Sequence, residues 1–296
     1  TDWYTSGRHE RLAAWLTSGE PIDIDSSLAM QANADNLHGR RLLDQLKMVQ
    51  PHHHQAEWAE LQSWDGTESV DSFAALLYQV WQRRHLRPWL VDRCLERLDV
   101  DSAAAAKAKH RLLRADTLFS DLRPDMRMLE MFEPADDQDL TLLTEGVELS
   151  LGGALAEIEQ LLGSDRTGWT WGALHQTTLR HPVLSKAEVP AEWGSLPSVP
   201  RAGSGDTVGL TGYDAGFNAV MGSSFRLAVD VGEWDSSRVV NAPGQSGDPH
   251  SDHYADLLDL WATNGSFPLL YSREAVEDAV DQRIILRAAA PAGGSR

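Results

Sequence analysis

The sequence predicts an α+β fold in which helices occupy the first part of the chain and antiparallel strands come late. Apolar residues recur at the spacing of one helix face in the first half, as Leu12, Trp15 and Leu16 do. Alternating apolar and polar residues, rich in strand formers, first occur at 223–231. Because helices and strands follow each other in blocks, the order favours α+β over an alternating α/β sheet.

Helical patterns dominate the chain up to the first strand. Asp25 or Ser26 is placed to cap the second helix, because a short polar side chain accepts a hydrogen bond from the first turn. Pro88 should kink or split the helix expected over 70–98, since proline removes a backbone donor and clashes with the preceding turn. Gly152 and Gly153 are expected to soften the last helix. The expected ranges are 8–16, 25–48, 57–61, 70–98, 103–113 and 139–162.

A long irregular connection separates these helices from the strands. Proline, glycine and serine are frequent from 182 to 216, a composition typical of loops that carry function or wrap another surface. The strand at 223–231 is expected to pair across a short turn with a strand at 237–241. Three further elements are expected: a helix at 253–262, a helix capped by Ser272 and a final strand at 283–288.

These elements divide the chain into four regions, without an internal repeat. The predicted regions are 1–181, mainly helical; 182–216, irregular; 217–290, strands and helices; and 291–296, a tail. Terminal segments without periodic apolar residues fray readily, which is why the last region is set apart.

The composition argues against two classes of partner. The net charge is −18, from 26 basic and 44 acidic residues. Such a chain repels the phosphates of nucleic acids and of anionic membrane surfaces. No apolar run has the length needed to cross a bilayer. We therefore expect neither nucleic acid nor membrane as a partner.

The histidines and the single cysteine are the residues most easily mistaken for a site. His52, His53 and His54 are adjacent, and adjacent residues of a regular element cannot all face one metal ion. His250 and His253 could share a helix face, but no third ligand is identifiable. No metal site is therefore expected. Cys94 lies in a helical pattern and is expected to be a core residue.

Thr1 offers an alternative route to catalysis. A threonine at an N-terminus can act as nucleophile, with its own α-amine as base. A helical pattern follows almost at once, however, where such a nucleophile should be followed by a strand. The chain also begins without a methionine, so Thr1 is expected to be a processing point, the boundary of the expressed segment or the edge of ordered structure.

One segment near the end of the chain carries a specific signal. It reads VNAPGQSGDP from Val240 to Pro249 and, after one residue, continues from Ser251 to Trp261. This segment resembles a stretch near the C-terminus of the penicillin acylase family, whose members are N-terminal-nucleophile (Ntn) hydrolases. The resemblance implies that the predicted elements form part of the αββα sandwich of that fold.

Shorter motifs extend the resemblance over nearly the whole chain, from Arg8 to Val280. Each of them is weak alone, but they follow one another in the family's order. They are the helix at 8–16, Trp64-Asp65-Gly66, Trp171-Gly172 with His175, His181-Pro182, and Gly205-Asp206-Thr207.

The resemblance implies a reaction for which this chain lacks essential residues. Family members cleave themselves into a small α and a large β subunit, and the β subunit begins with a serine. Its hydroxyl attacks an amide carbonyl, its α-amine serves as base, and a downstream asparagine helps to stabilise the oxyanion. Both residues precede the family helix that Arg8 to Leu16 resembles, so neither is expected here. Asn241 does not match the catalytic asparagine.

Arg8 matches a family arginine that supports the active-site network, and its guanidinium suits that task. A surface arginine without such a role is the alternative.

The glycines at 244 and 247 are expected to supply positive φ in a tight turn. No cofactor is expected in this chain, because the family's structural calcium ligands fall mainly upstream. The remaining motif residues are expected to be structural: Gly244, Gln245, Ser246, Gly247, His253, Tyr254, Trp171, Gly172 and His175.

The resulting hypothesis is a C-terminal part of a penicillin-acylase-like amidohydrolase, inactive on its own. Its partners would be the α subunit and the N-terminal part of the β subunit, and the complete enzyme would cleave a small N-acyl amide. The resemblance also implies a periplasmic or secreted enzyme. The alternatives are a free-standing binding or scaffold module of the same fold, and a different hydrolase that uses Thr1 or the histidines.

Overall fold

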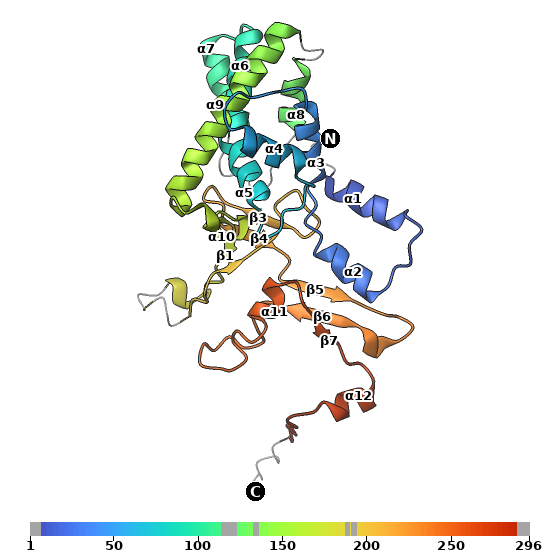
Figure 1. Ribbon diagram of the computed structural model, residues 1–296. Helices are drawn as coiled ribbons and strands as arrows, with labels where there is room; N and C mark the ends of the chain where they lie inside the picture. Colours follow the sequence, from blue (N-terminus) through green and yellow to red (C-terminus); the bar gives the residue numbers. More distant parts are fainter. Residues whose placement is uncertain (1–6, 114–122, 133–135, 187–189, 191–193, 289–296) are drawn as a thin grey trace, which may run out of the picture.

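The computed structural model describes residues 7–113, 123–132, 136–186, 190 and 194–288. Helices fill the first part of the described chain and three small antiparallel sheets follow, which confirms the predicted α+β order. Figure 1 shows the longest helices in a lobe at the top, the sheets below them, and the C-terminal segment farthest away. Among the described residues, no helix is both long and apolar enough to span a membrane.

The helical part contains two helices, α8 and α10, that the sequence did not predict. Its helices are α1 Gly7–Leu16, α2 Ile24–Gln31, α3 Leu37–Gln45, α4 Gln55–Ser63, α5 Phe73–Val80, the π-helix η1 Trp81–Leu86, α6 Arg87–Arg97, α7 Ser102–Leu112, α8 Arg123–Glu130, α9 Asp137–Leu162 and α10 Trp171–Leu174.

The helix predicted over 25–48 is wrong, because the structure has the two helices α2 and α3 there. Asp23 caps α2: its carboxylate accepts from the Ser26 amide at 2.8 Å, and the Ser26 hydroxyl accepts from the Asp23 amide at 2.9 Å. Asn36 caps α3 by accepting from the Gly39 amide at 2.7 Å. Short polar side chains between the helices thus offer the backbone hydrogen bonds that compete with a continuous helix.

Pro88 does not break the helix predicted over 70–98. It is the second residue of α6 and comes directly after the π-helix η1, where the Arg87 amide donates to the Gln82 carbonyl. The irregularity comes earlier, as the π-helix η1, which joins α5 to α6. The buried apolar face of α5 is therefore continued by Trp81, whose indole nitrogen donates to the Ser150 hydroxyl of α9 at 2.8 Å.

Helix α9 runs without interruption through Gly152 and Gly153, so the softening expected there is absent. These glycines instead allow close packing. A Cβ at Gly153 would lie 2.6 Å from His85 Nδ1, and one at Gly146 would lie 2.3 Å from Trp89. Helix α9 packs against η1 and α5, and this contact forms the centre of the larger hydrophobic core.

The strands form separate small sheets. The pairs β1–β2 and β3–β4 are two-stranded, and β5–β6–β7 is three-stranded, all antiparallel. The remaining elements are β1 Gln176–Thr177, β2 Val199–Pro200, β3 Thr211–Tyr213, β4 Ala219–Gly222, β5 Phe225–Ala228, β6 Arg238–Asn241, α11 Leu258–Ala262, β7 Phe267–Pro268 and α12 Arg273–Asp278.

The predicted hairpin is confirmed as β5 and β6, with Phe225 opposite Asn241 and Leu227 opposite Val239. Strand β5 is an edge strand. Its alternation places Arg226 and Ala228 in the interior and leaves Phe225 and Leu227 exposed. One point of the open edge is covered, because the Gln31 side chain donates to the Leu227 carbonyl at 3.0 Å.

Two predictions near the end of the chain are wrong. The helix expected over 253–262 begins only at Leu258, because turns at 248–257 hold the preceding residues. The strand expected over 283–288 is absent from the structure, and Ile284 and Leu286 are 81% and 92% exposed. A strand needs a neighbour to pair with, and the described sheets end at β7. The cap at Ser272 is confirmed, since its hydroxyl accepts from the Ala275 amide at 3.1 Å. The tail at 291–296 lies outside the described residues.

Candidate functional site

The motif residues Trp171, Gly172 and His175 lie together on and beside α10. The indole of Trp171 is fully buried and stacks on the imidazole of His175. Tyr213 and Phe217 meet the Trp171 ring edge-on at 5.7 and 6.2 Å. The Trp171 indole nitrogen donates to the carbonyl of Gly203 at 2.9 Å, so the stack also holds the loop that follows β2.

Gly172 is required by a close backbone contact. Its amide donates to the Val70 carbonyl at 2.7 Å, and a Cβ there would lie 2.9 Å from the same oxygen. Any larger residue would push α10 away from the segment before α5. In this structure Gly172 therefore has a packing role.

His175 is a buried, neutral histidine. Its Nδ1 lies 2.9 Å from the Phe217 carbonyl and must carry the proton, because a carbonyl oxygen can only accept. Burial lowers the pKa of His175 to about 4. Nε2 is buried and has no hydrogen-bond partner. A histidine in this state is a weak base with no route to solvent, so the site is an anchoring point for the fold.

A buried acid, Glu68, lies next to this aromatic group and was not predicted. Asn36 donates to its carboxylate at 2.7 Å, and Gln79 donates to the same oxygen. The hydroxyl of Tyr213 donates to Gln79 in turn, which links the acid to the Trp171 stack. The sequence offered no signal for Glu68, because its partners come from helices and loops far apart in the chain.

The loop that resembles the family's glycine–aspartate motif faces this acid. Gly203 donates its amide to the Glu68 carbonyl at 2.8 Å, and Asp206 is 4% exposed. Burial is the main cause that raises the pKa of Glu68 to about 7, and the nearby charge of Asp206 adds to it. The motif residues are thus joined to the helical lobe by a buried polar cluster.

Gly244 to Gly247 form a tight loop around one carbonyl oxygen. The amides of Gln245 and Ser246 donate to the His253 carbonyl at 2.9 and 3.0 Å. A Cβ at Gly244 would lie 2.3 Å from that oxygen. The positive φ expected at Gly244 and Gly247 is wrong, since neither glycine adopts it. Gly244 is required for close approach, and Gly247 has open space around its Cα.

The side chains of His253 and Tyr254 point to different partners. His253 is exposed and its Nδ1 lies 2.8 Å from the Asp256 carboxylate, which raises the pKa of the imidazole. The Tyr254 hydroxyl donates to the Gly194 carbonyl, and its ring lies against His181. This loop is therefore fastened to the irregular connection, and its residues form no nucleophile–base pair.

The histidines that the sequence singled out lie in separate places. His250 pairs with Asp248 at 3.2 Å, away from the His253 pair. The amides of His52 and His53 both donate to Glu148 of α9. Within the part of the chain that the structure describes, no three His, Cys, Asp or Glu residues are grouped so that they could hold a metal ion.

Arg8 and Cys94 also have defined surroundings. Arg8 is half-buried on α1, which packs against α3, and its Nε has no hydrogen-bond partner. Thr1 and Asp2 lie outside the described residues. Cys94 is confirmed as a core residue: its thiol lies 3.6 Å from the Met128 carbonyl, and burial raises its pKa to about 11. A protonated, buried thiol is not a nucleophile.

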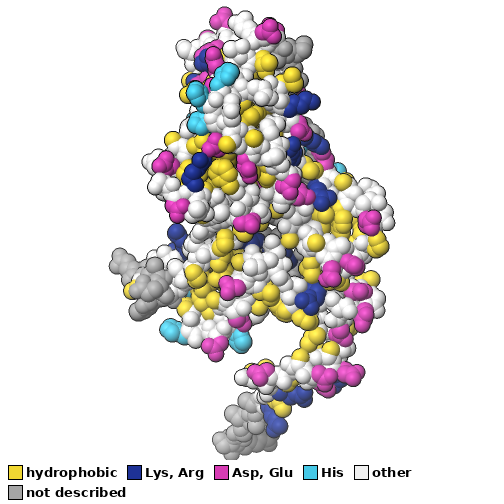
Figure 2. Space-filling model, in the orientation of Figure 1, with side chains coloured by type: hydrophobic (Ala, Val, Ile, Leu, Met, Phe, Trp, Pro, Cys, Tyr) yellow, Lys and Arg dark blue, Asp and Glu magenta, His cyan; other side chains and the backbone are white. Residues whose placement is uncertain are grey.

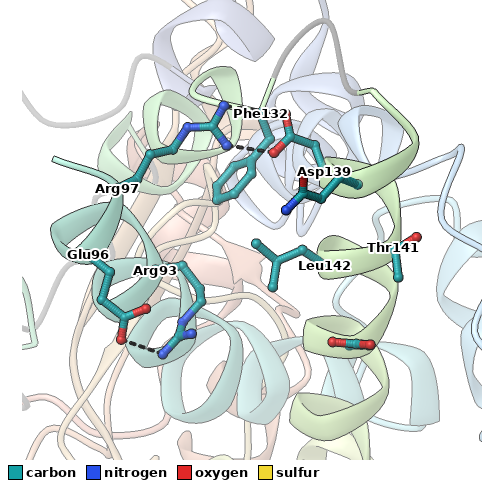
Figure 3. Close-up of a pocket in the computed structure, with 9 residues that line it drawn as sticks. Arg93, Glu96, Arg97, Phe132, Asp139, Thr141 and Leu142 are labelled. Atoms are coloured by element: carbon teal, nitrogen blue, oxygen red, sulfur yellow. Dashed lines mark hydrogen bonds and ion pairs between the residues drawn. The ribbon is translucent and has the colours of Figure 1, made fainter.

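A cavity of about 490 Å³ lies in the helical lobe between α6 and α9 (Figure 3). Two ion pairs lie in its wall: Arg97 binds Asp139 at 2.6 Å, and Arg93 binds Glu96 at 2.6 Å. Phe132 supplies an apolar wall, and Glu145 also lines the cavity. None of the residues that resemble family motifs lines this cavity.

The similarity of the whole sequence to known proteins agrees with this arrangement of helices, hairpin and glycine loop. The sequence model described as penicillin amidase matches residues 1–278. The chain belongs to the penicillin amidase family. Penicillin G acylase from Alcaligenes faecalis has the same fold over 98% of this chain and 54% of its own, with a TM-score of 0.54 and 15% identity.

Curated relatives in the family are longer than this chain. Acyl-homoserine lactone acylase QuiP of Pseudomonas aeruginosa is 29% identical over 88% of this chain and 34% of its own length. Penicillin acylase 2 proenzyme of Pseudomonas sp. strain SE83 is 30% identical over 96% of this chain and 36% of its own. This penicillin amidase chain thus spans about a third of the relatives it matches.

Proposed function

We propose that this chain is the C-terminal part of an N-acyl amide hydrolase whose nucleophilic serine and oxyanion asparagine lie outside it. The proposal is carried by one observation: the family model matches residues 1–278 of this chain, yet the chain spans only about a third of the length of the curated relatives. The portion present here corresponds, on the residues that resemble family motifs, to the end of the β subunit.

The geometry of the motif residues supports a scaffolding role for this part. His175 is buried and neutral, Gln245 and Ser246 use their backbone amides to hold a loop, and Cys94 is protonated. None of these groups is arranged to attack an amide carbonyl. Arg8, with a buried and unpaired Nε, is the described family-motif residue we assign to support the active site of the complete enzyme.

The exposed apolar surface of the β5–β6–β7 sheet supports the proposal that another part of the protein packs against it, whether covalently attached or not. Phe225 and Leu227 are 55% and 37% exposed on one face of β5, and Val229, directly after the strand, is 41% exposed. Figure 2 shows hydrophobic side chains gathered over the lower half of this face of the molecule. An apolar, open strand edge is normally covered in a finished protein. We assign the cover to the α subunit and the N-terminal part of the β subunit.

The complete enzyme would hydrolyse the amide bond of a small N-acyl compound and release an acid and an amine. The names of the relatives, an acyl-homoserine lactone acylase and a penicillin acylase, indicate the substrate range to be screened. A structural calcium of the complete enzyme would take its ligands mainly from the part upstream of this chain, where the family resemblance places them. We place the enzyme in the periplasm or outside the cell.

The test is intact-mass spectrometry, under denaturing conditions, of every polypeptide in protein purified from the complete gene. A second chain that begins with serine, together with release of acid from a panel of N-acyl lactones and N-acyl β-lactams, would support the proposal. A single chain that starts near Thr1 and leaves the panel intact would contradict it. That outcome would favour the free-standing binding module.

A further inference from the structure

A second cavity, of about 570 Å³, lies where β1, β4 and α11 approach one another, and two of its lining residues, Ala242 and Trp261, belong to the segment that resembles the family near its C-terminus. Its size is that of a site for a small organic ligand. Its walls combine hydroxyl groups, apolar side chains and two arginines. The lining includes Thr178, Arg180, Arg201, Thr211, Met221 and Trp261.

Arg201 is the most unusual residue of this cavity, because its charge is buried. The side chain is 5% exposed, and its guanidinium lies over the Trp261 ring at 4.1 Å. Its Nη1 donates to the carbonyls of Trp261 and Ala262, at 2.9 and 2.7 Å. Neutral carbonyl oxygens fix the position of a guanidinium but do not cancel its charge.

A second buried arginine adds to the same positive region. Arg226 is 7% exposed and donates to the Trp261 carbonyl at 2.7 Å. Among the described residues, neither Arg226 nor Arg201 has an Asp or Glu as ion-pair partner. Burial lowers the pKa of both guanidinium groups, and the charge of Arg226 lowers that of Arg201 further, to about 10. Arginine remains charged under these conditions, so Arg201 brings an uncompensated charge to the cavity wall, and Arg226, which does not line the cavity, shares the Trp261 carbonyl with it.

The other wall groups determine which anion fits. Asp214 lines the cavity, but its Oδ1 accepts from the Gly216 amide and from the amide and side chain of Asn218, within its own turn. Arg180 is exposed and gives the cavity a second positive charge beside Arg201. Apolar surface comes from Leu179, Ala219, Val220, Met221, Ala242 and Trp261.

We infer that this cavity binds a carboxylate attached to an apolar body, with Arg180 and Arg201 facing the charge and the wall at Met221 and Trp261 facing the body. The charge balance favours an anion, because burying the Arg201 guanidinium without a counter-ion is costly and a carboxylate in the cavity offsets that cost. The apolar walls favour an organic acid over a small inorganic ion. This inference does not depend on amide hydrolysis.

The carboxylate has two conceivable sources, a free organic acid or an Asp or Glu side chain from the rest of the protein. The experiment uses protein purified from the complete gene, crystallised with and without 4-bromobenzoate. The anomalous signal of bromine locates the probe, and 4-bromobenzamide, which has the same shape without the charge, serves as control. Calorimetry in solution measures the affinity of both probes.

A bromine peak in the cavity with the acid, and none with the amide, establishes a site for a free organic acid. An Asp or Glu from outside this chain within hydrogen-bond distance of Arg180 or Arg201 establishes the same chemistry with a protein source. A cavity that holds neither carboxylate, or that takes acid and amide equally well, overturns the inference.

Two variants sharpen the solution measurement. Arg180→Gln removes an exposed arginine without disturbing the core, and we expect 4-bromobenzoate to bind about three- to tenfold more weakly, with a smaller loss of affinity on adding salt. Arg273→Gln on α12 removes an equally exposed arginine that does not line the cavity and should leave the affinity unchanged. Equal affinities of the Arg180→Gln variant and the parent protein for the acid would contradict the assignment of Arg180.

Discussion

The indole of Trp171 and the imidazole of His175 are stacked with their centroids 4.4 Å apart and their planes 8° from parallel. Trp171 is the first residue of α10 and His175 directly follows its last residue, so the stacked rings span this short helix. Because the same rings contact Tyr213 of β3, and Trp171 also contacts Phe217 in the turn between β3 and β4, the stack connects the helical lobe to the strands. The first prediction concerns this contact.

Replacing His175 by alanine should lower the free energy of unfolding by about 3 kcal/mol, because it leaves a cavity between aromatic rings and removes the donor to the Phe217 carbonyl. Urea denaturation followed by tryptophan fluorescence measures the change. His250→Ala, at a side chain that is 93% exposed, is the control and should cost almost nothing. Equal effects of the two substitutions would refute an anchoring role for His175.

His175 and Glu68 should change the free energy of unfolding in opposite directions as the pH changes. Below its ordinary pKa of 6.5, His175 takes up a proton only in the unfolded chain, because its folded pKa is about 4. Between 4.5 and 7, Glu68 holds a proton only in the folded chain, because its folded pKa is about 7. Over roughly pH 4.5–6.5 the two contributions cancel.

Glu68→Gln should expose the histidine contribution alone. The unfolded variant then binds more protons than the folded one between about pH 4 and 6.5, so its stability should fall as the pH falls, by up to about 1.4 kcal/mol per pH unit. The measurement is a series of urea titrations over that range for the variant and the parent protein. Parallel curves for both proteins would show that Glu68 does not titrate as described.

Gly244 and Gly247 provide a matched pair of substitutions in one loop. Gly244→Ala places a Cβ 2.3 Å from the His253 carbonyl and should destabilise the protein by about 1–3 kcal/mol. Gly247→Ala meets no atom within 4 Å and should be close to neutral. Thermal unfolding of both variants tests the expectation, and a larger loss at Gly247 would reverse our assignment.

Cys94 should react slowly with thiol reagents in the folded protein. Its thiol is buried and its pKa is raised to about 11, so little thiolate is present at neutral pH. Since it is the single cysteine of the chain, labelling with iodoacetamide followed by intact mass reports on it alone. Complete labelling in 6 M guanidinium and almost none without it is the expected result; fast labelling of both would place the thiol at the surface.

Local patterns predicted the elements whose determinants lie close together in the sequence. The hairpin of β5 and β6 followed from alternation at 223–231, and the cap at Ser272 from a single side chain. The break between α2 and α3 was missed because Asn36 reads as an ordinary helix residue until its cap geometry is known. The buried state of Glu68 was missed because Asn36 and Gln79, its partners, come from separate helices.

The candidate site was predictable to a similar extent. The motif around Trp171 and His175 was recognised, and the structure places both residues in one aromatic cluster. The charge of Arg201 beside a cavity was not predictable, because its burial results from Trp261, sixty residues away in the chain. The strand expected at 283–288 failed for the opposite reason: strand-forming residues such as Ile284 and Ile285 were present, but no described strand pairs with the segment.

The exposed apolar edge at β5 also constrains how such a chain can be produced. A covering segment on the same polypeptide is present at a high effective concentration, so it pairs with the edge regardless of how much protein the cell makes. A cover supplied as a separate molecule competes with self-association through Phe225 and Leu227, which grows with expression level. Continuous synthesis followed by cleavage therefore favours correct assembly over mixing of separately made chains.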